Sequence, residues 1–130
     1  MKAIITLNQL NKARTRALRW ANRMEHCHFD GMPFYLLRVA NALRSAGFEI
    51  DIILGRIGGM YSFAECGLSV NFKDGRYPEF TVSQVSEYIG ISERFSNLEN
   101  IRRIKKLIND ACQQLADHLN QYGEPKNEVL

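Results

Sequence analysis

The segment from residue 25 to residue 30 holds the densest group of reactive side chains in the chain: Glu25, His26, Cys27, His28 and Asp30. The two histidines could ligate a metal, and Cys27 could act as a nucleophile with His28 as its base. On a helix, residues two positions apart point about 200° away from each other, so His26 and His28 could share a metal only where a helix has unwound. The other cysteines and the third histidine add no ligand pair at zinc-site spacing. We therefore expect no metal, no cofactor and no catalytic residue, and we keep a small enzyme with its site at this segment as the alternative.

A row of basic residues near the start of the chain points to a different kind of chemistry. At 100° per residue, four cations fall within an arc of about 60° on one helix face, over a length of about 16 Å: Lys12, Arg16, Arg19 and Arg23. The guanidinium group of arginine binds phosphate or carboxylate through two parallel hydrogen bonds. A solvated outer face usually mixes both signs of charge, but the first acidic residue of the chain is Glu25. The pattern favours an acidic macromolecule as the partner.

A second basic cluster falls in the early turns of the last expected helix, and it consists of Arg102, Arg103, Lys105 and Lys106. Basic residues near a helix N-terminus oppose the helix dipole, which invites a functional reason for their position. Glu99 and Asp110 lie three or four residues from several of them and could instead pair with them. We include the cluster among the candidate binding residues and keep simple pairing as the alternative.

The net charge of the chain is concentrated in its first part. Among the 130 residues the formal net charge is +3, and residues 1–47 alone hold eight basic and two acidic residues, so the remainder is net negative. A basic end on a nearly neutral body fits a surface that faces nucleic acid, an acidic protein patch or an anionic membrane. It argues against an acidic mimic of DNA.

The cysteine count and the hydropathy pattern indicate in which cellular compartment the protein is expected. Three cysteines at wide spacing, with no signal-like apolar stretch in the first residues, favour a reduced, cytoplasmic location. No apolar run reaches the 18 residues that a spanning helix needs. We expect no membrane span.

Helical periodicity predicts four helices that would position these residues. Thr6 and Gln9 form a capping-box pattern that opens a helix over 7–27. A second helix is expected from Pro33 until Gly47 ends it, and a short third helix over 81–89. The longest is expected over 97–122, with its apolar stripe buried along one face of a sheet and His118 partly buried and hydrogen-bonded within that stripe.

Alternation of apolar and polar residues predicts strands between the second and third of these helices. We expect strands over 48–54, 60–64 and 68–72, with a bulge or bend near Gly67, and a short strand over 77–80 after an Asp74-Gly75 hairpin turn. The glycine-rich segment 55–59 lacks the Lys-Ser/Thr of a phosphate loop and precedes a strand, so we interpret it as a hairpin loop.

Two partial resemblances accompany this order of elements. Residues 82–92 resemble the first helix and turn of a helix-turn-helix over about ten residues, and the helix, strands, helix order resembles a double-stranded-RNA-binding domain in outline. The lysine-rich start that the second helix of that domain should have is replaced by Ser96-Asn97-Leu98-Glu99. No residue role is transferred from either family.

The predicted fold class is α+β. It has two N-terminal helices, a three- to four-stranded antiparallel sheet, a short helix and a long C-terminal helix packed on one sheet face. Residues 1–130 are expected to form a single domain, with 124–130 as a candidate flexible tail. The predicted function is that of a non-enzymatic accessory or regulatory protein. Its basic first helix would bind nucleic acid or a protein of nucleic-acid machinery, as a monomer or a homodimer, and an obligate homodimer with the long helix at its interface is a further alternative.

Overall fold

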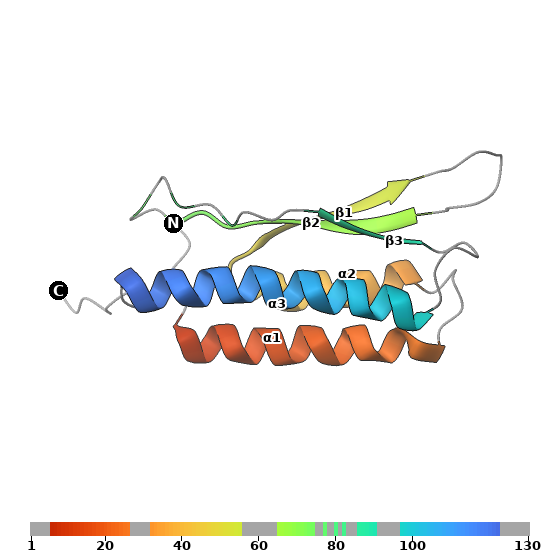
Figure 1. The fold of residues 1–130 in the computed structure, drawn as a ribbon, viewed down its shortest axis with the longest axis horizontal. Helices are drawn as coiled ribbons and strands as arrows, with labels where there is room; N and C mark the ends of the chain where they lie inside the picture. The colour runs from red at the N-terminus through yellow and green to blue at the C-terminus, as the bar shows by residue number, and fades with distance from the viewer. Residues whose placement is uncertain are drawn as a thin grey trace.

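The computed structural model describes residues 6–26, 32–55, 65–74, 77, 80, 82, 86–90 and 97–122. The elements in chain order are helix α1 (Leu7–Asn22), the 3-10 turn η1 (Arg23–His26), helix α2 (Met32–Arg44), strands β1 (Glu49–Gly55), β2 (Glu65–Asn71) and β3 (Ser86–Gly90), and helix α3 (Asn97–Tyr122). They are arranged in three layers (Figure 1). The sheet covers one side of α2 and α3, and α1 lies on the other side of these two helices.

Helix α1 begins at the predicted capping box, which is confirmed. The backbone N–H of Gln9 donates to Oγ1 of Thr6 over 3.2 Å, and the backbone N–H of Thr6 donates to Oε1 of Gln9 over 2.9 Å. The buried face of the helix consists of Leu10 and three alanines, whose small side chains let α2 and α3 approach closely: Leu10, Ala13, Ala17 and Ala21. The α-helix ends at Asn22 rather than at residue 27, and the chain continues in the tighter 3-10 turn.

The sheet is antiparallel with the order β1-β2-β3. Ile50 pairs with Val70 and Ile52 with Leu68, so these apolar side chains share the face toward the helices. Glu49 and Asp51 alternate with them and are exposed on the other face. The expected irregularity at Gly67 is wrong, because Gly67 pairs regularly with strand residues on both sides.

The predicted fold class is wrong. The described structure is predominantly helical, with α-helices of 16, 13 and 26 residues against strands of 7, 7 and 5 residues. The short helix expected over 81–89 is wrong in the part that the structure describes, because Ser86–Gly90 is strand β3; residues 81 and 83–85 lie outside the described residues. The segment Ser86–Gly90 has only five residues, which include the aromatic Tyr88 and the β-branched Ile89. Its apolar spacing fits a strand as well as a helix, and pairing with the free edge of β2 decides between the two. The resemblance to a helix-turn-helix is lost with it.

The strand expected over 77–80 is also wrong in the part that the structure describes. Tyr77 forms an isolated bridge with Asp74, and its N–H donates to the Asp74 carbonyl over 3.0 Å. The N–H of Phe80 then donates to the Tyr77 carbonyl over 3.0 Å, which is a second tight turn. The strand expected over 60–64 and the segment 123–130 lie outside the described residues.

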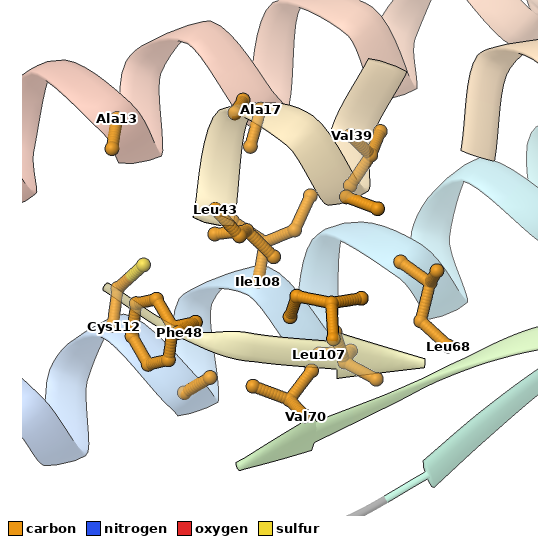
Figure 2. Packing of buried hydrophobic residues seen from close by; sticks show 14 of the residues in the cluster. Ala13, Ala17, Val39, Leu43, Phe48, Leu68, Val70, Leu107, Ile108 and Cys112 are labelled. Atoms are coloured by element: carbon orange, nitrogen blue, oxygen red, sulfur yellow. The ribbon is translucent and has the colours of Figure 1, made fainter. Parts of the chain in front are cut away.

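Helix α3 spans the predicted range, but it does not organise the sheet face alone. It packs against α1 on one side and against β3 on the other, while α2 packs against β1 and β2. Side chains from all three helices and from the sheet therefore meet in one core (Figure 2). The apolar stripe of α3 is buried in this core: Ile101, Ile104, Leu107, Ile108, Ala111, Cys112, Leu115 and Leu119.

Helix α2 ends as the sequence predicts. The chain leaves the helix through Gly47, whose φ of +93° is a conformation that L side chains rarely adopt. The N–H of Gly47 donates to the Arg44 carbonyl over 2.9 Å, which closes the helix end.

None of the helices in the described residues is both long and apolar enough to span a bilayer.

Candidate functional site

The basic ridge on α1, defined as Lys12, Arg16, Arg19 and Arg23, is exposed along its whole length. The opposite side of the same helix and turn is fully buried, with Leu10, Ala17, Ala21 and Met24 in the core. The prediction that the four cations share one exposed face is therefore confirmed. It follows directly from the helical period, because each cation is three or four residues from the next.

The ridge has little negative charge around it. Helix α1 contains no acidic residue, and within the described residues no ion pair is recorded for any of the four ridge cations. Arg14, which lies on the flank of α1, has a different role, since its Nε donates to Oδ1 of Asn109 on α3 over 2.9 Å. The ridge residues are thus available for an external anion, whereas Arg14 joins two helices.

One flank of the ridge adjoins a group of aromatic rings that sequence reasoning missed. The centroid of the Trp20 ring lies 6.4 Å from that of Phe34 and 6.3 Å from that of Tyr35, and the last two are 5.4 Å apart. The Arg23 guanidinium carbon lies 4.6 Å from the Trp20 centroid, and that of Arg38 lies 5.3 Å from Trp20 and 5.0 Å from Phe34. We call these five residues the aromatic-arginine cluster.

The aromatic-arginine cluster joins α1 to α2 and continues the ridge, because Arg23 belongs to both. Phe34 is 49% exposed, and Leu37 beside it on α2 is 41% exposed. The sequence held a partial signal, since Trp20 and Arg23 are three apart and Phe34 and Arg38 are four apart, which are spacings of helix neighbours. That these two pairs meet is a tertiary contact.

The second predicted cluster, on α3, is largely paired with acids. Arg102 and Arg103 lie 3.4 Å and 3.7 Å from the carboxylate oxygens of Glu99, and Nζ of Lys106 lies 2.7 Å from Oδ2 of Asp110. These are helix-surface pairs, each contributing about 0.2 to 0.5 kcal/mol. Within this cluster the alternative of simple pairing describes three of the four residues.

Helix α3 nevertheless begins beside the end of α1, as the two helices run antiparallel (Figure 1). A shallow groove between them is lined by Asn22, Glu25, Leu98, Ile101, Arg102 and Lys105. Two of the predicted α3 cations therefore lie near the end of the ridge. Glu25 lies in the same groove and reduces its positive charge.

The segment that looked most reactive contributes little to the described structure. The exposed His26 lies 3.8 Å from Oε2 of Glu25, and Cys27, His28 and Asp30 lie outside the described residues. Arg56, in the glycine-rich segment 55–59, also lies outside them. In the part of the chain that the structure describes, no group of three or more metal-ligating side chains comes together.

A buried polar pair lies near the C-terminal end of α3. Nε2 of His118 lies 2.7 Å from Oδ2 of Asp74, and both side chains are almost fully buried. The His118 ring is stacked on Phe80 at 3.8 Å, with Tyr77 and Tyr122 at 5.4 Å and 4.9 Å. The predicted hydrogen bond of His118 is confirmed, but the side chain is almost fully buried where partial burial was expected. Sequence analysis assigned Asp74 only to a turn and missed it as the partner.

Cys112 is a free cysteine in the core. Burial raises the pKa of its thiol to about 12, although the nearby Arg14 acts in the opposite direction. A thiol with this pKa is protonated at neutral pH and is a poor nucleophile. The side chains of Cys27 and Cys66 lie outside the described part of the chain.

The apolar stripe of α3, which suggested an interface between two copies, is already covered within one chain by α1 and the sheet. Of the larger apolar side chains on α3, Leu98 and Tyr122 at the two ends remain exposed. The stripe therefore offers little exposed apolar surface for a homodimer interface.

Comparison of the chain with protein-family models, with curated proteins and with solved structures finds no match in any of the three.

Proposed function

We propose that this protein is a non-enzymatic accessory or regulatory protein that binds nucleic acid through the basic ridge of α1. The observation that carries the proposal is the line of four exposed cations, three on the acid-free helix α1 and Arg23 at the start of the turn η1, set opposite a buried and well-packed face. Lysine and arginine side chains in such a line can neutralise successive phosphates and release their counterions. The proposed location is cytoplasmic, which suits a free, buried Cys112 thiol.

The chemistry of the ridge favours phosphate over an acidic protein surface as its ligand. Three of the four ridge residues are arginines, which bind phosphate oxygens with two parallel N–H groups. A specific protein interface usually has an apolar centre inside a polar rim. The central positions of the ridge are occupied by Arg16 and Arg19, and the exposed apolar side chains lie to one side on α2.

The test is binding to a fluorescently labelled oligonucleotide, measured by anisotropy at several salt concentrations. If four phosphates are contacted, the logarithm of the association constant should fall with the logarithm of salt concentration with a slope of about −3 on a single strand or about −4 on a duplex. Arg16→Glu should weaken binding at least about tenfold and reduce this slope. Lys73→Glu is the matched control, because it makes the same charge change at an exposed residue two positions after β2, a strand of the sheet that lies opposite α1.

Equal losses in the two variants would show that only net charge matters, and the assignment to α1 would then be wrong. Failure of the unaltered protein to bind any oligonucleotide at low salt would contradict the proposed function itself.

A further inference from the structure

We infer that the aromatic-arginine cluster receives an unpaired base, so that the preferred ligand is single-stranded nucleic acid. The inference rests on the proposed function and goes beyond it, because the basic ridge alone would bind the backbone of a duplex as well. It adds a second contact at the end of the ridge, where Trp20, Phe34 and Tyr35 lie with Arg23 and Arg38.

The first observation is an exposed ring held in place by other rings. Phe34 is 49% exposed, while its contacts with Trp20 and Tyr35 are both edge-to-face, at interplanar angles of 84° and 85°. These edge-to-face contacts hold the ring in one orientation. The Arg38 guanidinium carbon lies over the same ring, 5.0 Å from its centroid, so a base would stack on the part of the ring that Arg38 does not cover. A fixed, half-exposed aromatic ring is the type of platform on which bases stack without sequence preference.

The second observation is the position of the two guanidinium groups. Arg23 from the turn η1 and Arg38 from helix α2 approach the same indole ring, and within the described residues no ion pair is recorded for either. Two positive charges beside one ring repel each other, and an anion bound between them would offset this repulsion. No hydrogen bond is recorded for either guanidinium in the described residues, so their N–H groups can donate to phosphate oxygens.

The third observation is continuity. Arg23 ends the basic ridge and begins the cluster, so a strand whose phosphates follow the ridge would bring its next nucleotide to Phe34 and Arg38. Inside a duplex both faces of each base are covered by its stacked neighbours, so an unpaired nucleotide offers Phe34 a face that an internal base pair does not. The cluster therefore distinguishes single strands from duplexes.

Trp20 supplies a direct readout, because it is the only tryptophan in the chain. We expect a single-stranded oligothymidine to change its intrinsic fluorescence and to bind at least about tenfold more tightly than a duplex of the same length. Phe34→Leu should weaken single-strand binding by about 5- to 150-fold, the range for loss of one base–aromatic contact, and leave duplex binding unchanged. Phe34→Tyr keeps the ring and should restore binding.

Leu37→Ala is the matched control, because Leu37 is on the same helix, has similar exposure and offers no ring. It should leave the affinity for the single strand unchanged. Thermal unfolding of each variant separates loss of the contact from loss of the fold. If Phe34→Leu unfolds, the affinities of the unaltered protein for single strand and duplex, together with its Trp20 fluorescence, still test the inference.

Three results would overturn the inference in distinguishable ways. Equal affinity for single strand and duplex, with no fluorescence change, would remove the cluster from the site and leave the proposed function intact. Tight binding of polyglutamate that also depends on Phe34 would make the cluster a site for an acidic protein. Absence of binding to every oligonucleotide would end both proposals together.

Discussion

Aromatic rings gather around basic side chains in two parts of this molecule, and the two parts differ in the source of the negative charge. Near the end of α3, His118 lies among Tyr77, Phe80 and Tyr122 and contacts the buried carboxylate of Asp74. Between α1 and α2, Arg23 and Arg38 lie over Trp20, and no carboxylate partner is recorded for them in the described residues.

The comparison shows how one set of residue types can serve two purposes. The pair of His118 and Asp74 is complete within the chain and is closed to solvent, as expected of a pair that stabilises the fold. The aromatic-arginine cluster is half-exposed and lacks its anion, which supports our proposal that another molecule supplies one. Substitutions should therefore affect stability in the first group and binding in the second.

The largest effect is expected in the buried group. Asp74→Ala should lower the free energy of unfolding by about 3 to 5 kcal/mol, because it leaves His118 buried without its partner. Urea unfolding followed by circular dichroism measures this change. Asp110→Ala, which removes the exposed partner of Lys106, is the control and should cost less than about 0.5 kcal/mol. If Asp74→Ala cost no more than the control, the buried pair would not stabilise the fold and the contrast between the two groups would fail.

A moderate effect is expected at Cys112, which lies on α3 in the core. Its pKa is about 12 in the folded protein against an ordinary value of 9.0, so the folded state retains a proton that the unfolded state loses above pH 9. The stability from this thiol is therefore fully present below pH 9. It decreases by about 1.4 kcal/mol per pH unit as the pH rises toward 12.

The measurement is the free energy of unfolding between pH 8 and pH 11, compared with that of Cys112→Ala. The two other cysteines are common to both proteins, so the difference between the curves isolates Cys112. The curves should converge as the pH rises. Parallel curves would mean that this thiol is not protected by burial.

The smallest effect on stability is expected on the ridge. The double variant Arg16→Glu/Arg19→Glu should change the free energy of unfolding by no more than about 0.5 kcal/mol, because both side chains are exposed and no ion pair is recorded for either among the described residues. Thermal unfolding without nucleic acid provides the measurement. A decrease of several kcal/mol in the free energy of unfolding would show that the ridge, like the buried group, stabilises the fold and is not only a binding surface.

Sequence analysis succeeded where the determining contacts are local. The capping box of Thr6 and Gln9 is formed within one turn, and the exposure of the ridge follows from the helical period of α1. The range of α3 also follows from its own apolar spacing. These features depend on residues that are three or four positions apart.

The features that sequence analysis missed depend on residues far apart in the chain. Asp74 and His118 are 44 positions apart, so the turn residue gave no sign of its buried partner. Strand β3 forms because the edge of β2 can pair with it, and a segment of five residues contains too little periodicity to reveal that. The meeting of Trp20 with Phe34 and Arg38 likewise requires the packing of α1 on α2.

The spacing of the ridge also gives the free protein a small built-in repulsion. Lys12, Arg16, Arg19 and Arg23 follow one another at intervals of four, three and four residues, and each like-charged neighbour on a helix costs a few tenths of a kcal/mol. Dissolved salt relieves this repulsion in the unbound protein and at the same time competes with a polyanion for the same side chains. A higher ionic strength should therefore stabilise α1 in the unbound protein and destabilise the complex of α1 with a nucleic-acid strand.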